Sequence, residues 1–409
     1  MSVETSRTRP ARAVAARGGR LSRRLVALMA IACGAAVANL YYVQPLLNRI
    51  AQAMHVSDGT AGVLVTCTQV GFLLGVALLV PLGDMLERRR LVTVLMLGAT
   101  AAAAGCAAAP GFSILAAALV ALGALSVVAQ VLVPLSSALA APEERGQVVG
   151  TVMSGLLIGI LLARTLSGTV GQLGGWRLSF ALAAVVMAVL ALLMWRALPV
   201  SEPEGEVRYV EALRSVFSLV HREPLLRQRM ALGALGFAGF SVLWTALAFL
   251  LGGAPYHYGE AVIGLFGLAG AAGAAAAPVA GRLADLGYVR VTYTVFLACV
   301  LASWGLLALG RSSLVALVAG IMLLDLGCQG SHISNQTAIY GLGSELRSRL
   351  TTAYMVSCFT GASVGSLVSA VVYEADGWRA TCAVGGGLAA TALLLWGATA
   401  RRRFSSGRD

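Results

Sequence analysis

Long apolar runs without a single charge constrain this chain more than any other feature. Leu91–Ala109 has the sequence LVTVLMLGATAAAAGCAAA, and Leu178–Trp195 has the sequence LSFALAAVVMAVLALLMW. Neither run alternates apolar and polar residues as a half-buried strand does. Runs of about 18 or more apolar residues cross a hydrocarbon core of about 30 Å as helices. Only 12% of the residues are charged, about half the share of a soluble domain. These features predict an all-α membrane protein, because a backbone in lipid must satisfy its own hydrogen bonds.

Twelve membrane spans are predicted from the apolar runs. They cover residues 25–47, 61–82, 91–109, 112–140, 148–172, 177–196, 226–251, 260–283, 291–309, 312–340, 350–373 and 378–400. The spans at 112–140 and 312–340 are longer than a bilayer requires, so we expect them to tilt or to extend into water.

The arginines predict the orientation. All thirty basic residues are Arg, and 25 of them fall in segments that face the cytoplasm if the N-terminus does. Four fall in the opposite loops and one, Arg164, lies within a span. This bias predicts a multi-pass protein of the cytoplasmic membrane with both termini cytoplasmic. The first apolar run follows a seven-Arg tail without a clear cleavage site, so we expect a retained span. The tail is expected to lie near anionic lipid and not to bind nucleic acid.

The chain repeats itself at an offset of about 200 residues. Gly-Gly-Trp176-Arg177 opens the sixth predicted span and Asp-Gly-Trp378-Arg379 the twelfth, while Trp195 and Trp396 close the same spans. Such matches predict a duplication, and hence two pseudo-symmetric six-helix bundles. The expected organisation is a basic tail (1–24), an N-terminal bundle (25–196), a cytoplasmic linker (197–225), a C-terminal bundle (226–400) and a short cytoplasmic tail (401–409).

The loop after the second span carries a family pattern: Gly, three residues, Asp, a basic residue, any residue, Gly and two basic residues. Asp84, Arg88 and Arg89 match it, whereas Val80, Met85 and Glu87 depart from it. The second half carries a partial copy, matched by Gly281, Asp285 and Arg290.

Through these motifs and the 6 + 6 arrangement, the chain resembles the major facilitator superfamily over nearly its whole length. Asn39–Pro45 looks like the first span of bacterial carriers related to drug and sugar efflux proteins. The resemblance implies the major facilitator fold and alternating access, with conformational gating by Asp84, Arg88, Arg89 and Asp285.

The fifth span holds a degraded form of the glycine pattern of proton-driven antiporters. The matching positions are Gly150, Gly159, Ala163-Arg164 and Ser167-Gly168, with Ala-Arg in place of Gly-Pro. Two interpretations remain open for these glycines: close helix packing, or control of proton leakage.

Polar side chains within apolar spans are the candidates for a binding site, because each is costly in lipid. Those proposed to bind substrate are Asn39, Tyr42, Gln44, Gln130, Arg164, Trp244, His332, Asn335 and Gln336. For any one amide the alternative is an interhelical hydrogen bond. For the cluster in the span at 312–340, a water-lined cavity is favoured.

Two charges lie deep in the predicted spans. Arg164 can neutralise an anionic substrate, pair with a carboxylate or extend outward to the interface. Asp325 is the predicted proton-coupling residue, because low-dielectric surroundings favour the neutral form of a carboxyl and allow it to exchange protons. The alternative is a static ion pair between Asp325 and Arg164.

Other chemistries find little support in the sequence. The seven Cys lie within spans without metal-ligand spacing, so no metal site, disulfide or cofactor is expected. Gly361-Ala-Ser363-Val-Gly365 matches the spelling of a nucleophile elbow, but in the middle of a span it lacks the strand-to-helix turn that this motif needs. The protein is therefore expected not to be an enzyme.

The predicted function is secondary active transport of a small molecule by alternating access, with proton-coupled efflux favoured. The alternatives are a proton symporter or uniporter for nutrient uptake, and a non-transporting membrane sensor. The expected partners are a small-molecule substrate, protons and membrane lipid, and the protein is expected to be monomeric.

The topology leads to a first testable prediction. A reporter enzyme that is active only in the periplasm, fused after Asp409, should give no signal, because twelve spans return the chain to the cytoplasm. The same reporter inserted after the first span should be active and serves as the control. A strong signal from the C-terminal fusion would require an odd number of spans.

Overall fold

The structure is a computed structural model that describes residues 21–200, 209–270, 289–343 and 346–405. In the first half of the chain the elements are α1 (Arg23–Ala38), η1 (Gln44–Leu46), α2 (Leu47–Met54), α3 (Asp58–Leu78), η2 (Val80–Asp84), α4 (Arg88–Ala108), α5 (Phe112–Leu125), α6 (Val128–Leu139), α7 (Arg145–Gly174) and α8 (Trp176–Ala197).

In the second half they are α9 (Tyr209–Arg222), α10 (Pro224–Gly252), α11 (Glu260–Leu265), η3 (Phe266–Gly270), α13 (Val289–Ala308), η4 (Leu309–Arg311), α14 (Leu314–Tyr340) and α15 (Arg347–Ser405). The segment expected to be a linker thus contains a helix, α9.

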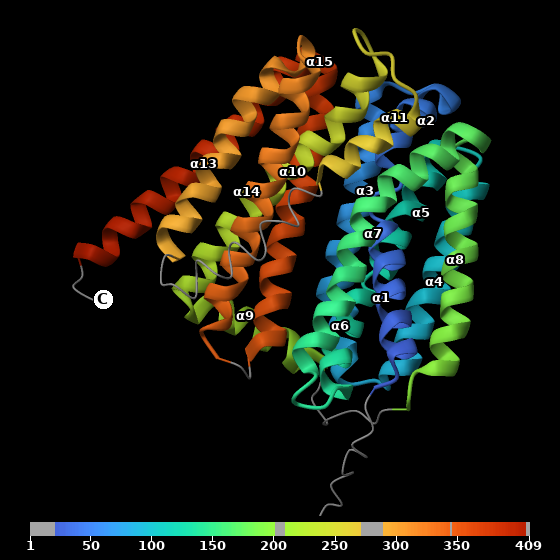
Figure 1. The fold of residues 1–409 in the computed structure, drawn as a ribbon, viewed down its shortest axis with the longest axis vertical. Coiled ribbons are helices and arrows are strands. Elements are labelled where there is room, and N and C mark those ends of the chain that lie inside the picture. Colours follow the sequence, from blue (N-terminus) through green and yellow to red (C-terminus); the bar gives the residue numbers. More distant parts are fainter. Residues whose placement is uncertain (1–20, 201–208, 271–288, 344–345, 406–409) are drawn as a thin grey trace, which may run out of the picture.

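The long helices form two groups that lie side by side (Figure 1). In the first group α1 packs on α7, α3 on α5 and α4 on α8, and in the second α10 packs on α15 and α13 on α14. The groups meet where α3 contacts α15 and α7 contacts α11. In Figure 1, α2 and α11 lie at one end of this junction and α9 lies toward the other, and we call these the α2–α11 end and the α9 end.

Within the described ranges, nine helices are long and apolar enough to cross a membrane. One of them, α15, combines the spans predicted at 350–373 and 378–400, which meet at the non-helical Gly377. Helix α1 has 16 residues and is shorter than the span predicted there. The span predicted at 260–283 begins with α11 and η3 and continues beyond the described part. The all-helical membrane fold is therefore confirmed, and the count of twelve stays a prediction.

The first predicted span, 25–47, is wrong as one continuous helix. Helix α1 ends at Ala38, turns follow, and the chain resumes as η1 and α2. Pro45 accounts for part of this break, because it has no N–H to bond the carbonyl of Tyr41 and its ring would clash there. The span predicted at 112–140 also breaks, at Ser126–Val127 between α5 and α6. The two breaks meet, since Nδ2 of Asn39 donates to Oγ of Ser126 at 3.1 Å.

The outer surface is apolar, as lipid requires. Helix α8 exposes large apolar side chains at helical spacing, namely Leu178 (46%), Leu182 (48%), Val185 (59%), Val189 (52%) and Leu192 (49%). A soluble protein rarely leaves a patch of this kind uncovered. The helix therefore presents this stripe to the hydrocarbon and its opposite face to the protein.

Each helix group contains an equivalent close contact at a glycine. A Cβ at Gly159 of α7 would lie 2.3 Å from the carbonyl oxygen of Gly34 on α1, and a Cβ at Gly361 of α15 would lie 2.1 Å from that of Ala234 on α10. These pairs are related by the offset seen in the sequence. The helix-packing interpretation of Gly159 thus accounts for its presence, because only glycine allows the backbones to approach so closely.

The repeated Gly-Trp pairs also occupy equivalent places. Gly175 and Gly377 adopt φ angles of 82° and 73°, which favour glycine. Each precedes a buried tryptophan, Trp176 or Trp378, both 3% exposed. The turn therefore lets the chain reverse direction and place an indole in the core at the same point of each half.

The glycine packing leads to a second prediction. Gly159→Ala should destabilise the protein, because its Cβ would overlap the backbone of α1 and overpacking typically costs about 1–3 kcal/mol. Gly150→Ala on the same helix is the matched control, because nothing lies within 4 Å of its Cβ position. Thermal unfolding of the purified variants in detergent should show a lower midpoint for Gly159→Ala alone. Equal midpoints for the two variants would contradict the packing role.

Candidate functional site

Arg164 is a buried cation at the junction of the two groups. It lies on α7 and is 3% exposed. Its Nε donates a 2.6 Å hydrogen bond to Oε1 of Gln44. The guanidinium carbon lies 3.7 Å from the ring centroid of Trp244 and 4.5 Å from that of Tyr41. Desolvated cation–π contacts contribute about 2 kcal/mol or more. The side chain thus points into the protein and does not extend to the lipid interface.

One edge of this guanidinium is unfilled. Nη2 of Arg164 is buried and makes no hydrogen bond within the described structure. A buried donor without an acceptor costs about 1–3 kcal/mol, and more when the group is charged. The unfilled edge is thus a feature that stability alone does not favour.

Asp325 lies on α14 and contacts the same indole. It is 4% exposed, and its Oδ1 accepts a long hydrogen bond of 3.4 Å from Nε1 of Trp244. Its Oδ2 faces Gly270 of η3, where a Cβ would lie only 2.5 Å away. Among the described residues no direct ion pair joins Asp325 to Arg164. Trp244 contacts both charges and connects them through its ring face and its N–H.

The local chain geometry positions these groups. The break after α1 carries Gln44 to α7, and Oγ of Ser167 donates to the carbonyl of Tyr42 at 2.6 Å, which ties the break to α7. On the other side, glycines of α11 and η3 let these segments lie against Arg164. A Cβ at Gly264 would lie 2.4 Å from its carbonyl oxygen, and one at Gly267 would lie 3.0 Å from its Cβ.

A small cavity adjoins the guanidinium. It has a volume of about 10 Å³ and is lined by Gln44, Pro45, Arg164, Trp244, Leu247, Ala248 and Ile263. This is about the room of one water molecule. Its lining combines apolar side chains with the guanidinium and one amide, and it comes from both helix groups.

A second polar cluster lies further along α14. The hydroxyl of Tyr354 lies 3.1 Å from Nδ1 of His332 and accepts from Nδ2 of Asn335 at 3.3 Å. Oδ1 of Asn335 in turn accepts from Nη1 of Arg229 at 3.2 Å. Phe237 packs on His332 with ring centroids 5.2 Å apart. His332 and Asn335 are therefore brought together, but in a cluster separate from the contacts of Arg164.

The remaining predicted binding residues take other places. Asn39 is buried and bonds Ser126 as described above, which is the interhelical role considered as its alternative. Tyr42 is half-buried, and its carbonyl is engaged by α7. Gln130 on α6 and Gln336 on α14 are both half-buried. The structure thus brings Gln44, Arg164, Trp244 and Asp325 into contact with one another and places the other predicted residues outside these contacts.

Sequence reasoning missed several residues of these clusters as site residues, among them Phe240, Tyr354 and Arg229. Phe240, whose ring centroid lies 5.9 Å from the Arg164 guanidinium, and Tyr354 are aromatic side chains in apolar spans, where no sequence signal separates them from ordinary core residues. Arg229 is 5% exposed, but in sequence it adjoins the charged central segment and resembles a loop arginine.

The predicted gating residues are only partly described. The backbone of Asp84 ends η2, its side chain lies outside the described part, and so does all of Asp285. Arg88 donates from Nε to the carbonyl of Gly83 at 3.3 Å. The guanidinium of Arg89 lies 4.1 Å from the ring centroid of Trp195, so it packs within its own helix group.

Polar contacts join the two groups at the α2–α11 end. Nη1 of Arg49 lies 3.4 Å from Oε1 of Glu260 and donates to the carbonyl of Gly171 at 3.0 Å. Nδ2 of Asn48 donates to the carbonyl of Ala248 at 2.7 Å. The contacts of Arg49 with Glu260 and of Asn48 with Ala248, together with the packing of α7 on α11, connect the two groups at this end.

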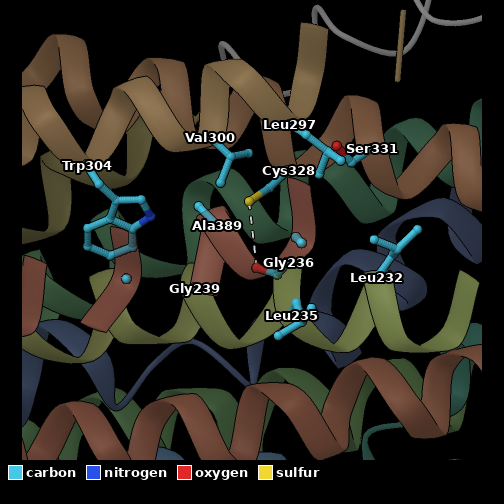
Figure 2. A pocket seen from close by; sticks show the side chains of 12 residues that line it. Leu232, Leu235, Gly236, Gly239, Leu297, Val300, Trp304, Cys328, Ser331 and Ala389 are labelled. Carbon is cyan, nitrogen blue, oxygen red and sulfur yellow. Dashed lines mark hydrogen bonds between the residues drawn. The ribbon is translucent and has the colours of Figure 1, made fainter. Parts of the chain in front are cut away.

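A second cavity lies inside one helix group (Figure 2). It has a volume of about 20 Å³, lies among α10, α13, α14 and α15, and is mostly apolar. Two buried donors at its wall, Nε1 of Trp304 and Oγ of Ser331, make no hydrogen bond within the described residues. Because no residue of the first group lines it, it does not have the two-sided geometry of a transport site.

Comparisons with known proteins show the family and the fold to which the chain belongs. The chain matches the family model described as Major Facilitator Superfamily over residues 26–359. It is 48% identical to the uncharacterized transporter YgaY of Escherichia coli O157:H7, over 92% of this chain and 95% of that protein. It is 36% identical to the Streptomyces coelicolor protein named probable transporter SCO4007, over 94% of this chain and 89% of that protein.

Solved structures share the fold at low sequence identity. A bacterial homolog of the human lysosomal transporter Spinster, in an inward-facing and occupied conformation, aligns with a TM-score of 0.75 and 13% identity over 92% of this chain and 96% of that one. The peptide transporter POT aligns with a TM-score of 0.74 and 16% identity over 92% and 94%. From the family match, the relatives and the fold, the chain belongs to the Major Facilitator Superfamily and is a multi-pass membrane protein that transports a small molecule.

Proposed function

We propose that this protein is a proton-coupled carrier that works by alternating access, with its substrate bound at Arg164, Trp244 and Asp325. One observation carries the proposal: the site is assembled from both helix groups. Gln44 and Arg164 come from the first group, and Trp244 and Asp325 from the second. A site shared in this way opens to one side or the other as the groups rock.

The contacts at the α2–α11 end support a closed state at that end. Under the proposed topology, with both termini in the cytoplasm, this end faces outward. Arg49 and Glu260 form a partly exposed pair, and exposed pairs contribute only about 0–1 kcal/mol. A pair of this strength can break in each transport cycle. We propose that it helps to hold the outward side shut, while Asp84, Arg88, Arg89 and Asp285 act at the opposite side.

Asp325 is the proposed proton-binding group. It is buried, contacts a neutral indole and makes no direct ion pair among the described residues. A carboxyl in such surroundings is costly as an anion, which favours proton uptake. The static ion pair is the less favoured alternative, because Arg164 contacts an amide and aromatic rings and forms no direct ion pair with Asp325 among the described residues.

The direction of transport depends on the charge of the substrate. A cation would compete with the proton at Asp325, which gives antiport and therefore efflux, the direction that the resemblance implies. An anion would bind at Arg164 together with a proton on Asp325, which gives symport. Efflux of a small amphipathic compound is our first candidate. Symport is the second, and the unfilled edge of Arg164 is the observation that favours it.

The membrane topology and the remaining polar residues belong to the same proposal. The protein is proposed to lie in the cytoplasmic membrane as a monomer, with bundles at 25–196 and 226–400 joined by the linker at 197–225. His332, Asn335 and Gln336 are proposed to line the path to the cytoplasm, with Asn39, Tyr42 and Gln130 opposite them. Transport by purified protein in liposomes would separate this proposal from a non-transporting sensor.

The proton role leads to a third prediction. For a compound that wild-type proteoliposomes exchange, Asp325→Asn should abolish accumulation driven by a pH gradient and preserve exchange at equal pH. The reason is that an amide of the same shape cannot carry a proton. Asp376→Asn is the matched control, since Asp376 is an exposed carboxylate, and it should accumulate like the wild type.

Other outcomes are equally informative. Accumulation retained in Asp325→Asn would remove Asp325 from proton coupling. If Asp325→Asn were instead unstable and the double variant with Arg164→Gln restored stability, the static pair would be supported in place of the carrier role.

A further inference from the structure

We propose that the substrate is an organic monoanion, a carboxylate on an aromatic body, whose carboxylate binds Arg164 while Asp325 carries a proton. This inference rests on the proposed function, because it assumes that the site holds substrate. It goes beyond that function by assigning the substrate class and the way in which its charge is balanced, and it selects symport, the second candidate, over efflux.

The guanidinium of Arg164 has a buried hydrogen-bond donor that a carboxylate can use. Its Nε is used by Gln44 at 2.6 Å, whereas its buried Nη2 has no hydrogen-bond partner in the described structure. A planar guanidinium presents its donors as a fork that matches the two oxygens of a carboxylate. A ligand oxygen at Nη2 would give a partner to a buried donor that the described residues leave without one.

The side chains around the guanidinium have the chemical character that suits an aromatic body, for which the two helix groups must move apart, because the adjoining cavity has a volume of only about 10 Å³. The rings of Trp244, Tyr41 and Phe240 lie 3.7, 4.5 and 5.9 Å from the guanidinium carbon. Leu247 and Ile263 line the adjoining cavity. Rings and aliphatic groups exclude water and bury apolar surface, while one cation fixes the orientation of the ligand.

A cationic ligand fits less well. The only carboxylate that the described residues offer here is Asp325, and both of its oxygens are already in contact with the protein. Oδ1 accepts from Trp244 and Oδ2 lies against Gly270. A cation would also be repelled by the positive charge of Arg164, and this repulsion is strong in a low-dielectric site.

The anion and the proton should bind cooperatively. The charged and titratable groups within electrostatic reach of Asp325 in the described structure are Arg164 from α7, Tyr41 from the break after α1, and Cys328 from its own helix. When Asp325 is ionised, it partly balances Arg164. When it is protonated, Arg164 has no nearby anion and binds a carboxylate more strongly. By reciprocity, the bound carboxylate favours protonation of Asp325 to the same degree, so one anion and one proton load together without changing the net charge.

Thermal unfolding of the purified full-length protein tests this inference with defined probes. Benzoate and phenylacetate are compared with their neutral amides, benzamide and phenylacetamide, and with their cationic amines, benzylammonium and phenethylammonium, at equal concentrations. A ligand that binds the folded state raises the midpoint in proportion to its occupancy. We expect at least one carboxylate to raise the wild-type midpoint more than its amide and its amine.

Variants locate the site and the proton. Arg164→Gln should weaken the carboxylate effect by about 10- to 100-fold in apparent affinity, as expected for a lost charged hydrogen bond. In the wild type the effect should weaken as the pH is raised and Asp325 loses its proton, over a range in which the probe stays ionised. In Asp325→Asn, which mimics the protonated residue, it should be independent of pH. If Arg164→Gln does not fold, the comparison of acid, amide and amine and the pH series of the wild type still test the inference.

Each other result overturns the inference. These results are no stabilisation by either carboxylate, equal or greater stabilisation by an amine or amide, a carboxylate effect that survives Arg164→Gln, or a wild-type effect that does not change with pH. The two proposals can fail separately. Loss of pH-driven accumulation in Asp325→Asn without carboxylate binding would leave proton coupling and remove the substrate class. Carboxylate binding at Arg164 with accumulation retained in Asp325→Asn would support the substrate class and remove the proton coupling.

Discussion

The indole of Trp244 connects the two buried charges of this protein, and the proposed mechanism depends on that contact. Its face lies 3.7 Å from the Arg164 guanidinium, and its N–H reaches Asp325 at 3.4 Å. A direct salt bridge would hold both charges in one state, because separating a buried pair costs several kcal/mol. An intervening ring stabilises each charge weakly and leaves each free to take another partner. Arg164 can then accept an anion and Asp325 a proton.

Irregular backbone makes this arrangement possible. In lipid a helix can break only where protein groups satisfy the freed backbone, and the break after α1 is buried against α5–α6 and α7. It presents Gln44 and Tyr41 to Arg164. The glycines of α11 and η3 perform the matching task in the second group by allowing close approach to Arg164 and Asp325. The site thus combines rigid helices with two irregular segments, one from each group.

The sequence predicted most of the fold and part of the candidate site, for identifiable reasons. Apolar runs and the Gly-Trp repeats are local signals, so they predicted the membrane helices and the duplication. Arg164 and Asp325 were identified because a charge within an apolar run is conspicuous. Their connection through Trp244 was not predictable, because it depends on how three distant helices pack. The bond between Asn39 and Ser126, 87 residues apart, was not predictable for the same reason. The contact of Tyr354 with His332 was not predictable either.

The electrostatic link between Arg164 and Asp325 can be measured without knowing the substrate. Infrared difference spectroscopy of the purified protein during a pH titration detects the C=O band of a protonated carboxyl, and the band lost in Asp325→Asn belongs to that residue. We expect this band to persist to higher pH in Arg164→Gln than in the wild type, because removing the cation removes what stabilises the carboxylate. A band that titrates at the same pH with and without the Arg164 charge would contradict an electrostatic link between the two residues.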